Sequence, residues 1–284
     1  MILDKVLSWK FPDIEHTATP RDCMLYALSI GVGDRPQDAR DLQFVYEHGL
    51  KFFPSQVNVI AHPGGWIQEP ELEVDWVKLL HGEQSFTMHA VPEPGKTYVG
   101  SYQVLDVVDK GPGKGALLFL RKELREKGHS AVVSTVTSTY FLRGDGGCGG
   151  TTTEAPAPHP VPERAPDQSC SLPTLARAAL IYRLSGDYNP IHADPVLARK
   201  AGFERPILHG LCTLGFATRA IISSCCNDEP ERLKLLQLRF SSPVYPGDTL
   251  VTDIWQDGDS VSFRSRVAER NVVVLNNGRA VVSA

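Results

Sequence analysis

The chain repeats one order of predicted elements, and this repetition constrains its fold more than any single motif. Residues 1–142 and 171–284 each predict helices first and a series of strands afterwards. Tyr26-Ala27-Leu28-Ser29 in the first half corresponds to Tyr182-Arg183-Leu184-Ser185 in the second. Weak similarity at a spacing of about half the chain is expected of a duplicated unit. Helices followed by antiparallel strands predict an α+β fold, with one long helix wrapped by a curved sheet in each half.

A segment of different composition separates the two halves. Residues 143–170 are rich in glycine and then in proline, at Gly144, Gly146, Gly147, Gly149, Gly150, Pro156, Pro158, Pro160, Pro162 and Pro166. Such a stretch predicts an extended, partly polyproline-like linker. The predicted domains are therefore an N-terminal repeat (1–142), a linker (143–170) and a C-terminal repeat (171–284).

Runs rich in Val, Thr, Tyr and Leu predict the strands of both halves. The predicted strands span residues 84–90, 97–108, 115–126, 131–142, 233–240, 249–256, 261–269 and 272–284. Helices are predicted over residues 23–28, 76–80, 175–184 and 207–223. Residues 1–22 show no clear period and are expected to form an irregular arm.

One short loop carries both an acid and an imidazole, in the segment Ser185-Gly186-Asp187-Tyr188-Asn189-Pro190-Ile191-His192. The preceding helix is expected to stop at the glycine, and the Asp, Asn and Pro residues favour a turn. Asp194-Pro195 then predicts a new helix, with the aspartate as N-cap and the proline at its first position. Helices at both ends would hold Asp187 and His192 still, as groups that transfer protons require.

The first half has no such pair. Its corresponding segment is Ile30-Gly31-Val32-Gly33-Asp34-Arg35-Pro36, and no histidine follows it. This difference predicts one active site per chain, with the first half contributing binding surface.

These residues also have structural explanations. An aspartate in a Gly-Asp-x-Asn-Pro loop is usually a turn former, and a single histidine is usually structural. His209, directly before the long apolar helix, is expected to bond to the backbone and is not counted among the catalytic residues.

Composition excludes several classes of function. The formal net charge of -4 argues against a general nucleic-acid binder, which needs a basic surface. Six cysteines without a C-x-x-C pair indicate free thiols in a reducing compartment. No apolar run approaches the length of a membrane span, and neither a secretory signal nor a terminal Ser-Lys-Leu is recognised. Metal-ligand spacings and nucleotide-binding motifs are absent as well.

The motif Tyr182-Arg183-Leu184-Ser185-Gly186-Asp187-Tyr188-Asn189-Pro190-Ile191-His192 resembles that of the hydratase 2 family, the MaoC-like (R)-specific 2-enoyl-CoA hydratases. This family includes the hydratase domain of multifunctional enzyme type 2 and stand-alone plant enzymes. Four further segments have counterparts there in the same order: Phe44-Val45-Tyr46-Glu47, Leu80-His81-Gly82-Glu83-Gln84, Asp109-Lys110-Gly111 and Pro243-Val244-Tyr245-Pro246-Gly247. The resemblance therefore extends over most of the chain.

The resemblance implies a double hot-dog fold and reversible hydration of trans-2-enoyl-CoA to (3R)-3-hydroxyacyl-CoA in fatty acid β-oxidation. It also implies a homodimer, with an acyl-CoA thioester as substrate and no metal or organic cofactor. The implied location is the peroxisome, and the cytoplasm is the alternative because no Ser-Lys-Leu type signal is recognised. Catalytic roles fall on Asp187 and His192 jointly, on Asn189 for orientation, on the Gly210 N–H for the oxyanion, and on Glu47. The implied CoA-binding residues are His81, Gly82, Lys110, Tyr188, Pro190, Ile191 and Phe240.

Three alternatives stay open at this point. A thioesterase shares the hot-dog fold, and only analogy with the Asp-x-Asn-Pro-x-His loop disfavours it. A non-catalytic acyl-CoA-binding protein is disfavoured by the intact Asp187, Asn189 and His192. A dehydratase that acts on carrier-protein substrates is not distinguished by the sequence.

Overall fold

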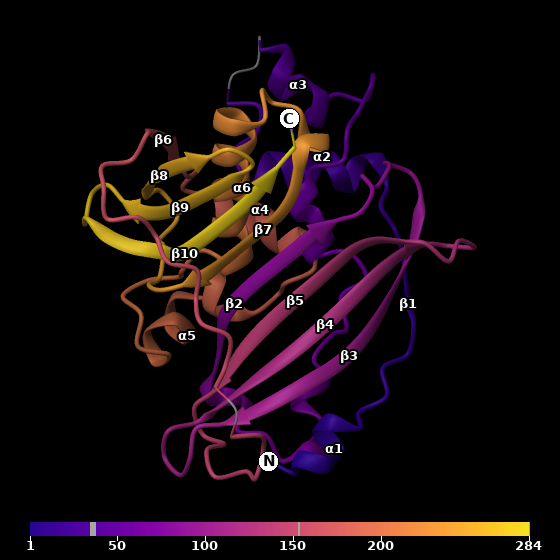
Figure 1. Ribbon diagram of the computed structural model, residues 1–284, viewed down its shortest axis with the longest axis vertical. Coiled ribbons are helices and arrows are strands. Elements are labelled where there is room, and N and C mark those ends of the chain that lie inside the picture. Colours follow the sequence, from indigo (N-terminus) through magenta and orange to yellow (C-terminus); the bar gives the residue numbers. More distant parts are fainter. Residues whose placement is uncertain (35–37, 153, 284) are drawn as a thin grey trace.

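The computed structural model describes residues 1–34, 38–152 and 154–283. Within this part of the chain, ten strands form one continuous sheet in the order β1-β3-β4-β5-β2-β7-β10-β9-β8-β6 (Figure 1). Every neighbouring pair is antiparallel. The strands are β1 (Ile14–Thr17), β2 (Leu79–Met88), β3 (Thr97–Asp109), β4 (Ala116–Glu126), β5 (Val132–Leu142), β6 (Gln168–Pro173), β7 (Leu233–Phe240), β8 (Thr249–Asp257), β9 (Ser260–Val267) and β10 (Val272–Val282).

The helices lie mainly on one side of this sheet (Figure 1). They are α1 (Leu3–Leu7), α2 (Pro20–Ser29), α3 (Ala39–Val45), α4 (Ala178–Tyr182), α5 (Pro195–Lys200) and α6 (Gly210–Cys225). Short 3-10 segments are η1 (Pro54–Asn58), η2 (Trp66–Gln68), η3 (Pro70–Leu72), η4 (Trp76–Lys78), η5 (Arg183–Ser185), η6 (Pro190–His192) and η7 (Pro230–Arg232). Within the described residues, no helix combines the length and the apolar character needed to cross a bilayer.

The two halves meet in the middle of the sheet, where β2 pairs with β7 and Phe86 lies opposite Leu236. In the second half, α6 packs against β6, β7, β8 and β10. Its residues from Cys212 to Ile222 are all buried, as expected of a helix that is mostly apolar. Gly215 lets α6 pass close to the end of α2, because a Cβ there would lie 2.5 Å from Ile30 Cγ2.

A buried ion-pair network also joins α6 to the first half. The guanidinium of Arg219 lies 3.3 Å from an Asp34 oxygen and 3.6 Å from an Asp41 oxygen. Arg219 and Asp41 are both buried. Removing one partner from such a group leaves a charge in a poorly solvated place, so the network ties the two halves together.

The first half differs from the expectation of one long helix in each half. The position against β2 and β5 is occupied by the short segment η1, which also contacts α6. The Nζ of Lys122 donates to the carbonyl oxygens of Val57 (2.6 Å), Asn58 (3.4 Å) and Ile60 (2.9 Å). The next turn of a longer helix would normally donate to these carbonyls. A buried ammonium group takes its place, and the left-handed backbone of Ala61 ends the helical path.

Two further segments correct the sequence-based expectation. Residues 1–22 are not an irregular arm, because they contain α1 and β1. α1 buries Val6, and β1 pairs with β3 so that Thr17 lies opposite Thr97. The helix predicted over residues 76–80 is only the short segment η4, because β2 already begins at Leu79. Ala284, the last residue of the final predicted strand, lies outside the described residues.

The segment predicted as a linker runs across the sheet (Figure 1). The N–H of Thr151 donates to the Val107 carbonyl at 2.9 Å, at the edge formed by β3. Farther along, a ring nitrogen of His159 lies 2.8 Å from the Ser262 hydroxyl on β9. The strand β6 then begins at Gln168, inside the predicted linker, and pairs with β8.

Candidate active site

The loop between α4 and α5 has the local structure that its sequence predicts. η5 ends at Gly186, whose φ of 118° is the left-handed conformation that glycine tolerates. The Asn189 side chain caps η6 by accepting from the N–H of Ile191 at 3.2 Å. Asp194 caps α5 by accepting from two backbone N–H groups, and Pro195 occupies the first helical position. Both ends of the loop are thus fixed.

His192 is oriented by a backbone contact. Its Nδ1 lies 2.9 Å from the Ile207 carbonyl oxygen, which can only accept, so Nδ1 carries the proton. Burial lowers the pKa of His192, while this hydrogen bond and the negative charge of Asp187 oppose that effect. The neutral ring therefore presents Nε2 as a lone pair, which is the form that a general base requires.

Asp187 offers its carboxylate beside this ring. Its side chain is exposed, and Oδ1 accepts a hydrogen bond from the Asn189 N–H at 3.0 Å. Asn189 therefore orients the acid through its backbone, while its own side chain caps η6. One ligand atom from each of Asp187, His192 and His209 lies within 4.8 Å of the others.

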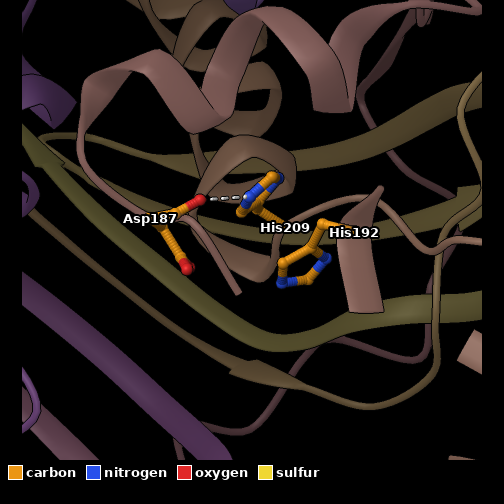
Figure 2. Close-up of side chains that lie close together, drawn as sticks. All are labelled: Asp187, His192 and His209. Carbon is orange, nitrogen blue, oxygen red and sulfur yellow. Dashed lines mark hydrogen bonds between the residues drawn. The ribbon is translucent and has the colours of Figure 1, made fainter. Parts of the chain in front are cut away.

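His209 is a functional candidate that the sequence reasoning set aside. As expected, it bonds to the backbone, because its Nε2 lies 3.1 Å from the Asp187 carbonyl oxygen (Figure 2). Its ring also stacks on His192, with centroids 3.7 Å apart and planes inclined by 27°. Burial and the neighbouring His192 lower the pKa of His209 to about 4. The sequence feature that could have indicated this role is the position of His209 directly before Gly210, at the start of the long helix.

These three side chains could also be considered as metal ligands. An imidazole binds a metal in its own ring plane, at ~2.0–2.1 Å for zinc. The rings of His192 and His209 are stacked with planes inclined by 27°, so an ion between them would lie outside at least one ring plane. Nδ1 of His209 is buried and has no hydrogen-bond partner within the described residues. This geometry suits the transfer of protons better than the binding of a metal.

A second group of predicted residues lies where the halves meet. The ring of Phe240 contacts the ring of His81 edge-on, with centroids 5.0 Å apart. The same Phe240 ring covers Gly210, where a Cβ would lie 3.2 Å from Cε1. Gly210 is the first residue of α6, so its N–H lies at the positive end of the helix dipole. Burial lowers the pKa of His81, and hydrogen bonds to Gln84 and to the Glu83 backbone, followed by the charge of Asp187, partly oppose this effect.

Comparisons with known proteins identify the family of the chain. A family model described as MFE-2 hydratase 2 N-terminal domain matches residues 16–144, and one described as MaoC like domain matches residues 158–277. The sequence is 37% identical to an Arabidopsis thaliana protein named peroxisomal enoyl-CoA hydratase 2, over 96% of this chain and 93% of that one. The chain belongs to the hydratase 2 family.

Solved structures show the fold of the chain. A MaoC-like dehydratase from Phytophthora capsici has a TM-score of 0.86 at 33% identity, covering 99% of this chain and 98% of its own. A Mycobacterium tuberculosis protein described as a double hot-dog matches with a TM-score of 0.55 at 18% identity over 96% of both chains. The predicted double hot-dog fold is confirmed.

Four residues that the hydratase 2 resemblance assigned to CoA lie in β2 or in the catalytic loop itself. Gly82 forms an irregularity in the pairing of β2 with β5, directly after His81. Tyr188 is largely exposed, and the guanidinium of Arg183 lies 5.3 Å from the centroid of its ring. Pro190 is exposed and Ile191 is partly buried. These four positions stay predictions for substrate binding.

Lys110 and Glu47 belong to the first half of the chain. Lys110 follows β3 and lines a pocket formed by Val108, Asp109, Lys110, Lys114, Glu154, Ala155 and Ala157. The Lys110 Nζ lies 5.7 Å from the centroid of the Phe141 ring. Glu47 follows α3 and is exposed, and its catalytic role stays a prediction. In the first half, the segment that corresponds to the catalytic loop includes Arg35 and Pro36, which lie outside the described residues.

Proposed function

We propose that this protein is a hydro-lyase that adds water reversibly to trans-2-enoyl-CoA and forms (3R)-3-hydroxyacyl-CoA in fatty acid β-oxidation. The observation that carries the proposal is the free Nε2 lone pair of His192 beside the Asp187 carboxylate. Membership of the hydratase 2 family and the relative named enoyl-CoA hydratase 2 support the substrate class. The (3R) configuration follows from the family resemblance.

The first step is attack by water on C3 of the enoyl thioester. Nε2 of His192 accepts a proton from the water, and the Asp187 carboxylate holds the same water by a second hydrogen bond. As the new C–O bond forms, the C2=C3 electrons move toward the thioester oxygen. The imidazolium that forms on His192 is stabilised by the negative charge of Asp187 nearby.

The oxyanion then needs a hydrogen-bond donor. The N–H of Gly210 at the start of α6 is suited to this role, because the helix dipole adds a favourable field. Collapse of the enolate takes one proton onto C2, supplied by the Asp187 and His192 pair. One water is consumed and the pair returns to its starting state, so the reaction as proposed needs no metal or organic cofactor.

The decisive experiment combines the protein with a trans-2-enoyl-CoA. Loss of enoyl-thioester absorbance without release of free thiol is expected of a hydratase, and chiral chromatography would then give the configuration of the product. Release of thiol would identify a thioesterase. If neither signal changed across short and long acyl chains, the proposed activity would be wrong.

Two coarser assignments belong to the same proposal. A homodimer is proposed from the family resemblance, and sedimentation at micromolar concentration would distinguish it from a monomer. A peroxisomal location is proposed because the Arabidopsis relative is named peroxisomal. Imaging of the tagged protein together with a peroxisomal marker would test that location.

A further inference from the structure

Gln84 is almost fully buried, and its side-chain amide contacts the ring of His81. Its Oε1 lies 2.8 Å from Nε2 of His81 and also accepts from the Ser138 hydroxyl at 2.7 Å. Only 2% of Gln84 is exposed. A buried amide in this position controls the hydrogen-bonding state of whichever ring nitrogen it touches.

The direction of this network is fixed at its far end. The carbonyl oxygen of Ser55 can only accept, and Nδ2 of Asn58 donates to it at 2.8 Å. Oδ1 of Asn58 must therefore point the other way, where it accepts from Nε2 of Gln84 at 2.7 Å. Gln84 is left with its oxygen toward His81. Reversing either amide would place two acceptors against each other in a buried site.

The protonation state of His81 follows from this order. Because Gln84 presents an oxygen, Nε2 of His81 carries a proton. Burial lowers the pKa of His81, whereas its hydrogen bonds to Gln84 and to the Glu83 backbone oppose that effect without reversing it. The ring is therefore neutral near pH 7, and with the proton on Nε2 the Nδ1 atom is a lone pair. The remaining nitrogen can accept a hydrogen bond but cannot donate one.

The support of this network is rigid. Lys122 holds the carbonyl groups at the end of η1, including that of Asn58. The Tyr26 hydroxyl donates to the Ser55 hydroxyl oxygen at 2.8 Å at the start of the same segment. The orientation of Asn58, and through it that of Gln84, is therefore set by the core of the first half.

We propose that Gln84 is a positioning residue that fixes His81 as the Nε2–H tautomer, so that Nδ1 accepts a hydrogen bond from an amide N–H of the thioester's pantetheine arm. The proposal rests on the proposed function, because it takes an acyl-CoA as the ligand. A phosphate group offers only acceptors at neutral pH and would be repelled by a lone pair, whereas the pantetheine arm carries two amide N–H groups. The first half, which has no catalytic pair, would thus orient the substrate for the second half. It would do so from the same ring that packs against Phe240 over Gly210.

The tautomer can be measured directly in the unmodified protein. A two-bond ¹H–¹⁵N spectrum at about pH 7.5 should show His81 protonated at Nε2 and unprotonated at Nδ1. The His81→Gln variant identifies the signal by its loss. An Nδ1–H tautomer, or a mixture of both, would overturn the proposal without the need for any variant.

Kinetics with two matched variants test the consequence for binding. Gln84→Glu places a carboxylate beside His81 and should leave both ring nitrogens protonated. KM for the enoyl-CoA should then rise about tenfold while kcat changes less than about threefold, as expected for loss of one hydrogen bond to the substrate. Ser138→Ala removes the other donor to Gln84 and should leave both the tautomer and KM unchanged.

An unchanged KM in Gln84→Glu, or an equal loss in Ser138→Ala, would refute the role of Gln84. Failure of the proposed function would be recognised separately, because the unmodified protein would then leave the enoyl-thioester absorbance unchanged. The tautomer spectrum requires no turnover and would still decide whether Gln84 sets the state of His81.

Discussion

The stacked histidines predict a loss of stability in mild acid, and its size can be worked out from the structure. Burial lowers the pKa of His209 from an ordinary value of 6.5 to about 4 in the folded protein. Between these two values the unfolded chain binds a proton that the folded chain excludes, so stability falls as the pH falls. The loss is about 1.4 kcal/mol for each pH unit below 6.5, or about 2 kcal/mol at pH 5. Above 6.5 the contribution of His209 is complete.

Urea unfolding at about pH 7.5 and about pH 5 measures this difference, and pH 5 still lies above the range in which most carboxylates titrate. His209→Gln should weaken the dependence on pH by about 2 kcal/mol, because glutamine does not titrate. His129→Gln, at an exposed position, is the matched control and should keep the full dependence. If His209→Gln lost as much stability in acid as the unmodified protein, the buried neutral state inferred for His209 would be wrong.

Four other changes have definite expected outcomes. Asp187→Asn should lower kcat by roughly 10²–10⁴-fold with an unchanged melting temperature. The control Asp194→Asn, in which the asparagine still caps the helix, should keep full activity. Equal losses in the two variants would contradict the catalytic role of Asp187. Gly210→Ala should lower kcat by about tenfold or more, because the added methyl group displaces the ring of Phe240. Helix stability should not fall, since alanine favours helices more than glycine. Normal turnover would show that the Phe240 ring can move without loss of activity. Arg219→Met should lower the free energy of unfolding by about 3 kcal/mol in urea titration, and a change below about 0.5 kcal/mol would mean that the ion-pair network contributes little. Lys110→Ala should raise KM more than it lowers kcat if this lysine binds CoA. Equal KM values for the variant and the unmodified protein would mean that Lys110 is a solvated surface residue without a role in binding.

The catalytic loop was predictable because its structure is local. Gly186, Asn189 and Asp194 act through their own backbone preferences and through caps within three residues. The separation of an acid and an imidazole on a loop fixed at both ends could therefore be derived before any tertiary contact was known. The strands of the second half were predictable from local composition, since they are rich in Val and Leu. In β9 the buried side chains alternate with partly buried ones.

The contacts that the sequence did not reveal all depend on the tertiary structure. His209 meets His192 only because the start of α6 is brought against the loop, where the Ile207 carbonyl also holds His192. The short η1 replaces a helix because a lysine on β4 reaches its carbonyl groups. The network behind His81 likewise joins residues that lie 26 positions apart, Asn58 and Gln84. Periodicity and motif spacing carry no information on such pairings.

The pairing of β2 with β7 has a consequence for how the chain emerges from the ribosome. Glu83 on β2 lies opposite Arg239 on β7, although the two residues are far apart in the sequence. The first half is therefore synthesised long before β7, the strand that pairs with its edge. During that interval the side of β2 that will pair with β7 is an edge with unpaired backbone groups, and β2 carries the apolar side chain of Phe86. Pairings between distant parts of a chain form slowly, and exposed edges of this kind promote aggregation. If translation pauses before residue 233, the unpaired edge of β2 stays exposed and can associate with other chains. The yield of soluble protein should therefore depend on chaperones that bind this edge until β7 has been synthesised.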